Sequence, residues 1–320
     1  MELLNNQQSR RTFIRNSLIT GSLFPLANNF PLQPAAKTES RLKIYIFSKH
    51  LQFLDYKNMA EAAAEMGFDG VDLTVRPKGH VLPERVETDL PKAVEAMRKV
   101  GFSPFIMTTA VQDANDPTDQ TVLSAASKLG FQYYRMNWLN YLEGKSIPDS
   151  IQHFQGVMKS LSELNKKVGM IGCYQNHAGD GMGASIWELW ELLRTADQKY
   201  IGAEYDIRHA MVEGAQSWKS GLRLIAPHIK VITLKDFKWV NNNGVSSIEQ
   251  TPLGEGMVDF KSYFSLLKQY KVDVPVTLHM EYPLGGANDG ATTLTVDKKV
   301  VFDAMKRDLS KARELLRSLE

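Results

Sequence analysis

The 320-residue sequence has a single cysteine, Cys173, and no long hydrophobic run after residue 40. One cysteine excludes an internal disulfide and a cysteine-based zinc site. No apolar stretch there approaches the ~20 residues that a membrane-spanning helix needs, so we expect no integral membrane segment in the mature chain. The chain also has no large excess of either charge, because 38 Lys and Arg are balanced by 36 Asp and Glu. We therefore expect neither nucleic acid nor an anionic membrane as a partner.

Familiar catalytic loops are missing as well. No serine lies on a G-x-S-x-G elbow and no G-x-x-x-x-G-K-[ST] loop exists, so acyl transfer and nucleotide hydrolysis are poorly supported. The first expected strand is followed by Phe47-Ser48-Lys49-His50-Leu51 and not by a glycine-rich phosphate turn. Its absence argues against an open, doubly wound sheet.

The first forty residues have the pattern of an export signal. Paired arginines, Arg10 and Arg11, precede a modest apolar run, Leu18 to Ala27, and small residues end at Ala36. Such a pattern is typical of a secretory signal, and the paired arginines resemble the twin-arginine signal, which carries folded proteins. We predict a signal peptide over residues 1–36, a mature domain over residues 37–320, and a periplasmic or otherwise exported protein. The alternative is a disordered basic tail.

From Leu42 onward a short apolar segment, a polar loop and a segment with apolar residues at three- and four-residue spacing alternate. The spacing predicts amphipathic helices, several of which end at a glycine, as in Met66-Gly67-Phe68. The short apolar segments predict strands over residues 43–47, 70–75, 103–108, 133–137, 169–174, 201–205, 230–234 and 274–279.

Eight such units without a break in composition predict a single (β/α)8 TIM barrel of the α/β class. Each right-handed crossover places its helix on the outside. The active site of such a barrel lies at the C-terminal ends of the strands, so the residues there are the first candidates for function.

Polar, charged and aromatic residues follow six of the expected strands. Their acids, imidazoles, amides and lysine suit a polyol substrate and a divalent cation. They are Arg76 and His80 after the second strand, Trp138 after the fourth, Gln175 and His177 after the fifth, Asp206 and His209 after the sixth, Lys235 after the seventh and Glu281 after the eighth.

Asp206 and His209 stand three residues apart where the sixth strand gives way to a loop. A carboxylate and an imidazole in that place suit a cation and a sugar hydroxyl. The alternative is that Asp206 caps the following turn and His209 packs against it.

Six segments, in order, resemble the xylose isomerase-like barrel superfamily, which includes sugar isomerases and epimerases related to tagatose 3-epimerase and endonuclease IV. The likeness spans about residues 42 to 318. Its carriers are Glu65-Met66-Gly67-Phe68-Asp69-Gly70-Val71-Asp72, Gln175-Asn176-His177, Asp206-Ile207-Arg208-His209, Leu234-Lys235-Asp236, Gly254-Glu255-Gly256 with Val258-Asp259-Phe260, and Glu281. The resemblance implies the fold but does not fix the substrate.

The resemblance also implies a divalent cation, Mn, Mg or Zn, held in the epimerases by a Glu, an Asp, a His and a Glu on strands five to eight. Asp206 and Glu281 match two of these ligands. Gln175 stands where the first Glu is expected and Thr233 where the His is expected. Gln175 ligates only through a neutral oxygen and Thr233 is a poor ligand, so His177 is the candidate for the missing nitrogen.

The same departures affect the mechanism that the resemblance implies. Epimerisation uses an acid/base group on each face of the substrate carbon, and Gln175 cannot abstract a proton. Glu281 remains as one base. Either His177 or Lys235 acts on the other face, or the reaction needs only one base, as isomerisation and elimination do.

Four further side chains are candidates for substrate binding: His209, Arg76, His80 and Trp138. Arg76 and His80 are equally consistent with a solvated loop, and Trp138 either stacks on a sugar ring or closes the core. Glu204 shares a strand face with Asp206 and should point into the barrel, paired or protonated. The loop from Phe237 to Met257 is long enough to cover the site as a lid.

The sequence therefore predicts an exported, metal-assisted isomerase, epimerase or lyase that acts on a small carbohydrate. A catalytically silent carbohydrate-binding barrel is the alternative. An endonuclease IV-like phosphodiesterase is unlike this chain, because it needs more histidines and acids and a more basic surface.

Overall fold

The alternation of short apolar strands and amphipathic helices is present throughout residues 42–317, the part of the chain that the computed structural model describes. These residues belong to one unit, Arg41–Glu320. The predicted signal peptide, with Arg10, Arg11 and its cleavage near Ala36, lies outside the described residues.

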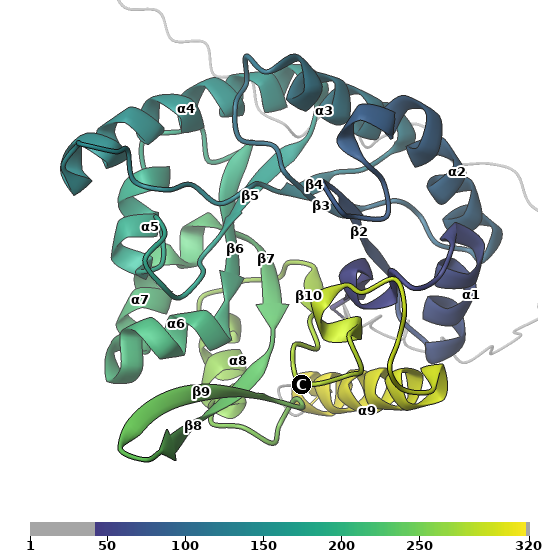
Figure 1. Cartoon of the computed structure of the whole chain (residues 1–320). Helices are drawn as coiled ribbons and strands as arrows, with labels where there is room; N and C mark the ends of the chain where they lie inside the picture. Colours follow the sequence, from purple (N-terminus) through teal and green to yellow (C-terminus); the bar gives the residue numbers. More distant parts are fainter. Residues whose placement is uncertain (1–41, 318–320) are drawn as a thin grey trace, which may run out of the picture. The chain divides into compact units, whose positions relative to one another are not determined.

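Eight parallel strands close into a barrel, which confirms the predicted fold class (Figure 1). Around the barrel the order is β1-β10-β7-β6-β5-β4-β3-β2. Each strand therefore pairs with the barrel strands that precede and follow it in the sequence, and β1 pairs with β10 to close the barrel. The strands are β1 (Ile44–Phe47), β2 (Gly70–Val75), β3 (Ile106–Thr109), β4 (Tyr133–Arg135), β5 (Ile171–Gln175), β6 (Ile201–Asp206), β7 (Ile229–Leu234) and β10 (Val276–Leu278).

Helices cover the outside of the barrel (Figure 1). They are α1 (Tyr56–Met66), α2 (Val86–Lys99), α3 (Pro117–Leu129), α4 (Ile147–Val168), α5 (Ile186–Leu193), α6 (Ile207–Gly214), α7 (Trp218–Ile225), α8 (Phe260–Gln269) and α9 (Lys298–Arg317). Among residues 42–317 no helix is both long and apolar enough to cross a membrane.

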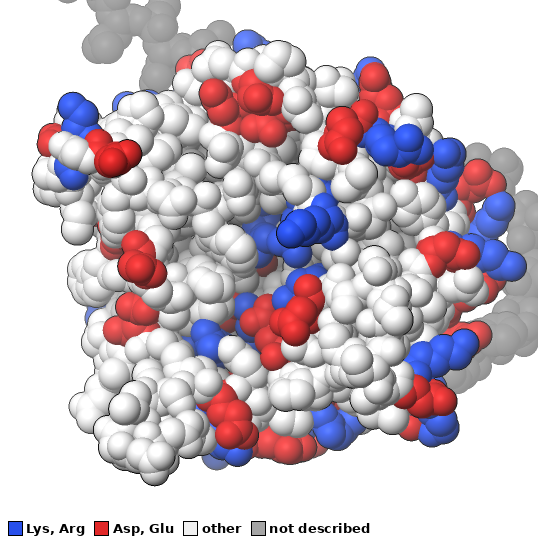
Figure 2. Space-filling view, viewed as in Figure 1, with Lys and Arg blue, Asp and Glu red and all other residues white. Residues whose placement is uncertain are grey.

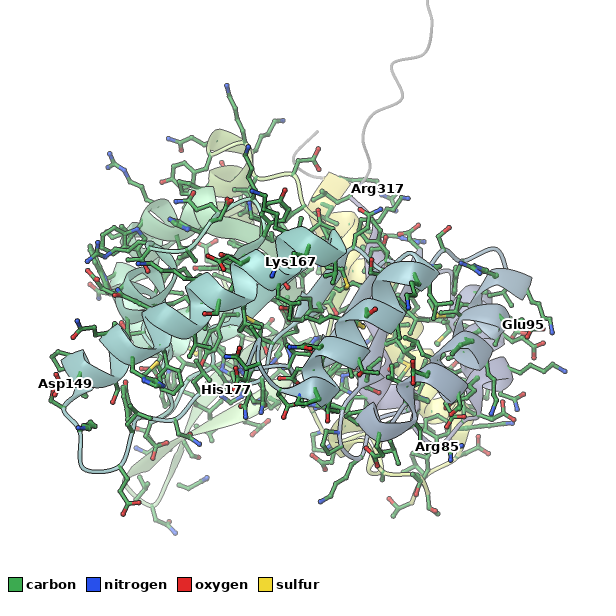
Figure 3. All side chains as sticks on the ribbon, turned by 90° about the horizontal axis from the view of Figure 1, so that it is seen from above. Arg85, Glu95, Asp149, Lys167, His177 and Arg317 are labelled. Carbon is green, nitrogen blue, oxygen red and sulfur yellow. The ribbon has the colours of Figure 1, made fainter. Side chains whose placement is uncertain are left out.

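Local sequence explains where these helices begin and end. The Asp55 side chain accepts the Asn58 N–H at the start of α1, and Gly67 ends that helix with a φ of 90°, a conformation that glycine adopts without strain. In Figure 3, Arg85 and Asp149, at the N-terminal ends of α2 and α4, lie on the same side of the barrel as His177. The loops that carry the candidate site therefore lie on the side where helices begin.

The third strand and the predicted lid loop differ from the prediction in an instructive way. The third strand begins at Ile106 and not at residue 103, because Pro104 has no N–H to donate to a neighbouring strand. The predicted lid loop is a β-hairpin, β8 (Asp236–Asn242) and β9 (Val245–Thr251). Its turn residues, Asn243 and Gly244, both have positive φ, as an Asn-Gly hairpin turn requires.

Candidate active site

Five side chains meet at the C-terminal end of the barrel strands, and we call them the mouth cluster: Gln175, Asp206, His209, Lys235 and Glu281. They come from the ends of β5, β6, β7 and β10 and from the start of α6. Acidic and basic side chains lie side by side in the hollow at the centre of the face shown in Figure 2. The sequence thus predicted correctly that these residues come together.

Asp206 is fully buried and uses its two carboxylate oxygens for different tasks. Oδ1 accepts the backbone N–H of His209 at 3.2 Å and caps α6, as the simpler interpretation of the D-x-x-H motif predicted. Oδ2 faces the mouth cluster, where it accepts the Gln175 amide N–H at 3.0 Å and lies 3.0 Å from Lys235 Nζ. The simpler interpretation is therefore confirmed for Oδ1, whereas Oδ2 is held by Gln175 and Lys235.

Lys235 lies between the two carboxylates of the cluster. Its Nζ is 3.0 Å from Asp206 Oδ2 and 3.3 Å from Glu281 Oε2, and its side chain is 3% exposed. Lys235 does not pair with Asp236, its neighbour in the chain. The Asp236 carboxylate instead accepts the backbone N–H groups of Phe237, Gly254, Gly256 and Val258, because successive strand residues point to opposite faces.

Glu281 is the most accessible acid of the cluster, with 22% of its side chain exposed. Its Oε1 accepts a hydrogen bond from Lys49 Nζ at 3.2 Å, while Oε2 faces Lys235. Burial alone would raise the pKa of Glu281, but the Lys235 and Lys49 ammonium groups and His279 hold it well below its usual range. Glu281 is therefore ionised at neutral pH.

His209 is a neutral imidazole. Burial, followed by the neighbouring Lys235, lowers its pKa well below the usual value. The backbone N–H of Ala178 donates to Nδ1 at 3.1 Å, which assigns the ring proton to Nε2. His177 lies against this ring with a centroid separation of 4.1 Å, and Trp138 lies 4.7 Å beyond His177.

A second set of polar side chains, the interior layer, lies one step deeper in the barrel: Asp72, Thr108, Glu204, Thr233 and Thr277. Thr108 and Thr277 donate to Asp72, and Thr233 donates to Glu204 Oε1 at 2.9 Å. Burial raises the pKa of Asp72 to about 6 and that of Glu204 to about 8, so Glu204 holds its proton, as predicted for an acid pointing into the barrel.

Arg135 lies between the mouth cluster and the interior layer. Its side chain is buried and its Nη1 donates to Gln175 Oε1 at 2.7 Å. The guanidinium also lies 4.3 Å from the centroid of the Trp138 ring. Because the Gln175 oxygen is engaged by Arg135, its amide nitrogen faces Asp206.

A cavity of about 410 Å³ opens above the mouth cluster. His177, His209 and Glu281 line it, together with three residues that sequence reasoning missed, Arg208, Ile248 and Gln250. Ile248 and Gln250 belong to β9, and the Asn-Gly turn signal would have revealed that hairpin. Lys49 was also missed, although it lies in the short 3-10 turn that follows β1.

Of the four predicted substrate-binding residues, only His209 lines the cavity. Trp138 packs against His177, which also lines the cavity, and its buried indole N–H has no hydrogen-bond partner among residues 42–317. Arg76 lies 5.6 Å from the centroid of the Phe47 ring. His80 bonds Ser48 Oγ through Nδ1 at 3.2 Å and lines a separate cavity of about 680 Å³, so it is not part of the mouth cluster.

The predicted metal ligands do not fit a divalent cation. Gln175 turns its N–H toward Asp206, and His177 Nδ1 lies on the Ala178 carbonyl. Thr233, which stands where the family's His is expected, donates to Glu204 in the interior layer. Within residues 42–317 no three His, Cys, Asp or Glu side chains are placed to hold a metal ion.

Comparison with known proteins agrees with the barrel. The family model described as "Xylose isomerase-like TIM barrel" matches residues 60–295. No curated protein sequence matches the chain.

Several solved structures share the fold at low sequence identity. The IolI protein with a bound zinc atom is 15% identical, with a TM-score of 0.67 over 87% of this chain and 99% of that one. D-psicose 3-epimerase from Clostridium cellulolyticum H10, solved with D-tagatose, is 13% identical, with a TM-score of 0.63 over 86% and 99%. The 3-keto-D-glucoside 4-epimerase YcjR from E. coli is 12% identical, with a TM-score of 0.60 over 84% and 100%. At these identities the likeness establishes the fold alone.

Proposed function

Because the chain belongs to the xylose isomerase-like TIM barrel family, we propose that it moves a proton at a carbon next to a sugar carbonyl. It is then an isomerase, epimerase or lyase of ketoses or keto-sugars. The observation that carries this proposal is Glu281, an ionised carboxylate that lines the cavity at the barrel mouth. The sugar epimerases among the structural neighbours support the same class of reaction.

Glu281 acts as the base in this proposal. A hydrogen next to a carbonyl becomes acidic when the developing negative charge on the carbonyl oxygen is stabilised. Lys235 and the Nε2–H of His209 stand beside Glu281 as hydrogen-bond donors for that oxygen. Gln175 is no second base, so a one-base isomerisation or elimination fits the site better than a two-base epimerisation.

Substrate binding is proposed for the side chains around the cavity. Arg208, His177 and Gln250 offer polar atoms at the wall of the cavity. The Trp138 ring has Arg135 on it, so a sugar can approach only the part of the ring that the guanidinium leaves free.

A catalytically silent carbohydrate-binding barrel is the second candidate. It is favoured by the two ion pairs of Glu281, because a carboxylate held by both Lys49 and Lys235 is a weaker base. The two candidates differ in turnover and not in binding.

Glu281→Gln tests the catalytic role. Loss of a positioned base should lower kcat/KM for the best ketose or 3-keto-glycoside of a panel by ~10²–10⁴. Glu95→Gln, an exposed change on α2, is the matched control and should leave kcat/KM unchanged. If the wild type binds a sugar but turns over no member of the panel, the silent barrel is the correct description.

We also propose that the protein is exported through the twin-arginine route, on the basis of Arg10 and Arg11. Changing both residues to lysine should trap the full chain in the cytoplasm, which immunoblots of cell fractions measure. Unchanged export of the double-lysine variant would refute this route.

A further inference from the structure

The nitrogen of Lys235 lies where the resemblance to sugar epimerases implied a metal ion. Asp206 and Glu281, the two carboxylates expected to ligate a cation, both turn one oxygen toward this ammonium, at 3.0 and 3.3 Å. These are distances of charge-assisted hydrogen bonds. The ligands are therefore satisfied by a side chain of the protein itself.

The charges of the site are balanced without a metal. Asp206 and Glu281 face two ammonium groups, Lys235 and Lys49, so these four side chains carry no net charge. A divalent cation between the carboxylates would stand next to the Lys235 ammonium and repel it. It would also meet the N–H of Gln175, which offers no lone pair on that side.

One N–H of the Lys235 ammonium lacks an acceptor when His209 carries its proton on Nε2. Two of its three protons point to Asp206 and Glu281. The third lies toward His209 Nε2 at 3.0 Å, but that nitrogen carries a proton because Nδ1 accepts the Ala178 N–H. Among the residues that the structure describes, this third N–H has no other acceptor, and both His209 and Glu281 beside it line the cavity.

We propose that Lys235 takes the place of the divalent cation, so that this barrel binds no metal at its mouth and polarises the substrate carbonyl with an ammonium group. The catalytic part of this inference rests on the function proposed above. Glu281 removes a proton from the hydroxyl-bearing carbon next to the carbonyl. The electron pair of that C–H bond forms a C=C bond, and the electron pair of the C=O bond moves to oxygen, which gives an enediolate. Lys235 donates a hydrogen bond to the enediolate oxygen. Glu281 then delivers the proton to the former carbonyl carbon while the proton of the neighbouring hydroxyl moves to the enediolate oxygen, so no oxidant or other reactant is needed.

Metal binding tests the replacement independently of turnover. We expect the purified wild-type protein to contain no stoichiometric divalent metal by elemental analysis and to show no binding of Mn²⁺ by calorimetry. Turnover of the keto-sugar panel should be the same before and after treatment with EDTA. One equivalent of retained metal, or turnover that EDTA abolishes and Mn²⁺ restores, would overturn the proposal.

Variants separate the charge of Lys235 from its bulk. Lys235→Met keeps a long apolar side chain and should lower kcat by ~10²–10³, the usual cost of removing one donor to a developing oxyanion. Lys219→Met, an exposed change on α7, is the control and should have wild-type turnover. Unchanged kcat in folded Lys235→Met would refute the catalytic role.

The double variant Lys235→Met/Gln175→Glu adds the opposite test. With the ammonium removed and a third carboxylate added, the mouth should bind Mn²⁺ by calorimetry, which the wild type should not. A folded double variant that still fails to bind Mn²⁺ would show that Lys235 is not what excludes the cation. If the wild type turns over no substrate, the proposed function fails, but these binding measurements still decide whether Lys235 replaces the metal.

Discussion

The mouth cluster and the interior layer each contain one Asp and one Glu, yet the two glutamates hold their protons differently. Glu281 at the mouth has two lysines beside it and a pKa far below the usual range, whereas Glu204 in the interior has a threonine hydroxyl and a pKa of about 8. The cationic neighbours of each glutamate, more than its residue type, therefore decide the direction in which its pKa shifts.

Arg135→Met should break this contrast and have the largest effect on stability. Arg135 is buried between the two sets and is the cationic neighbour of Glu204 and Asp72. Removing one partner of a buried charge network costs ~3–5 kcal/mol, so we expect a loss of unfolding free energy of that order in denaturant titrations. Arg85→Met, which removes a surface ion pair with Asp89, is the control and should leave the denaturation midpoint almost unchanged. Equal losses in both variants would contradict the role of Arg135.

Asp72→Asn should sharpen the contrast by a smaller amount and through pH. The pKa of Asp72 rises from 3.8 to about 6 in the folded protein, chiefly because of burial. A raised folded-state pKa contributes stability that is fully present below pH 3.8 and is lost as pH rises toward 6. Asn cannot ionise, so the variant should gain stability relative to wild type over this window, by up to about 3 kcal/mol above pH 6.

Thermal unfolding of the Asp72→Asn variant and the wild type across pH 3.5 to 7.5 measures this difference. The gap in Tm should grow between pH 4 and 6 and then stay level. A gap that is the same at every pH would mean that Asp72 does not titrate as its buried position implies.

Sequence alone was sufficient for the barrel and for most of the mouth cluster. Barrel strand β1 is buried along its whole length and reads as a continuous apolar run, Ile44-Tyr45-Ile46-Phe47, which is easy to recognise. Because the ends of parallel strands meet at one edge of the barrel, Asp206, Lys235 and Glu281 could be grouped without knowing the fold in detail.

Partners within the cluster could not be predicted in the same way. Lys235 and Asp236 are neighbours in the chain but point to different sides, so the ion pair forms with Asp206 and Glu281, which are distant in sequence. The direction of the Gln175 amide depends on Arg135, which no motif connects to it. His80 was grouped with the site because it follows a strand, although its loop turns back so that His80 bonds Ser48 and Thr74.

The hydrogen bonds between Asp236 and the loop before α8 restrict how the β8–β9 hairpin can move. Four backbone N–H groups converge on this one carboxylate, and Gly256 packs so closely against it that no larger residue fits. The hairpin is thus held at its base by Asp236, and the Asn243–Gly244 turn lies at the opposite end. We expect smaller displacements near the base than at the turn, so Ile248 and Gln250, which lie between the two, should move less than the turn does. The wall of the cavity can therefore stay in place while its outer edge bends.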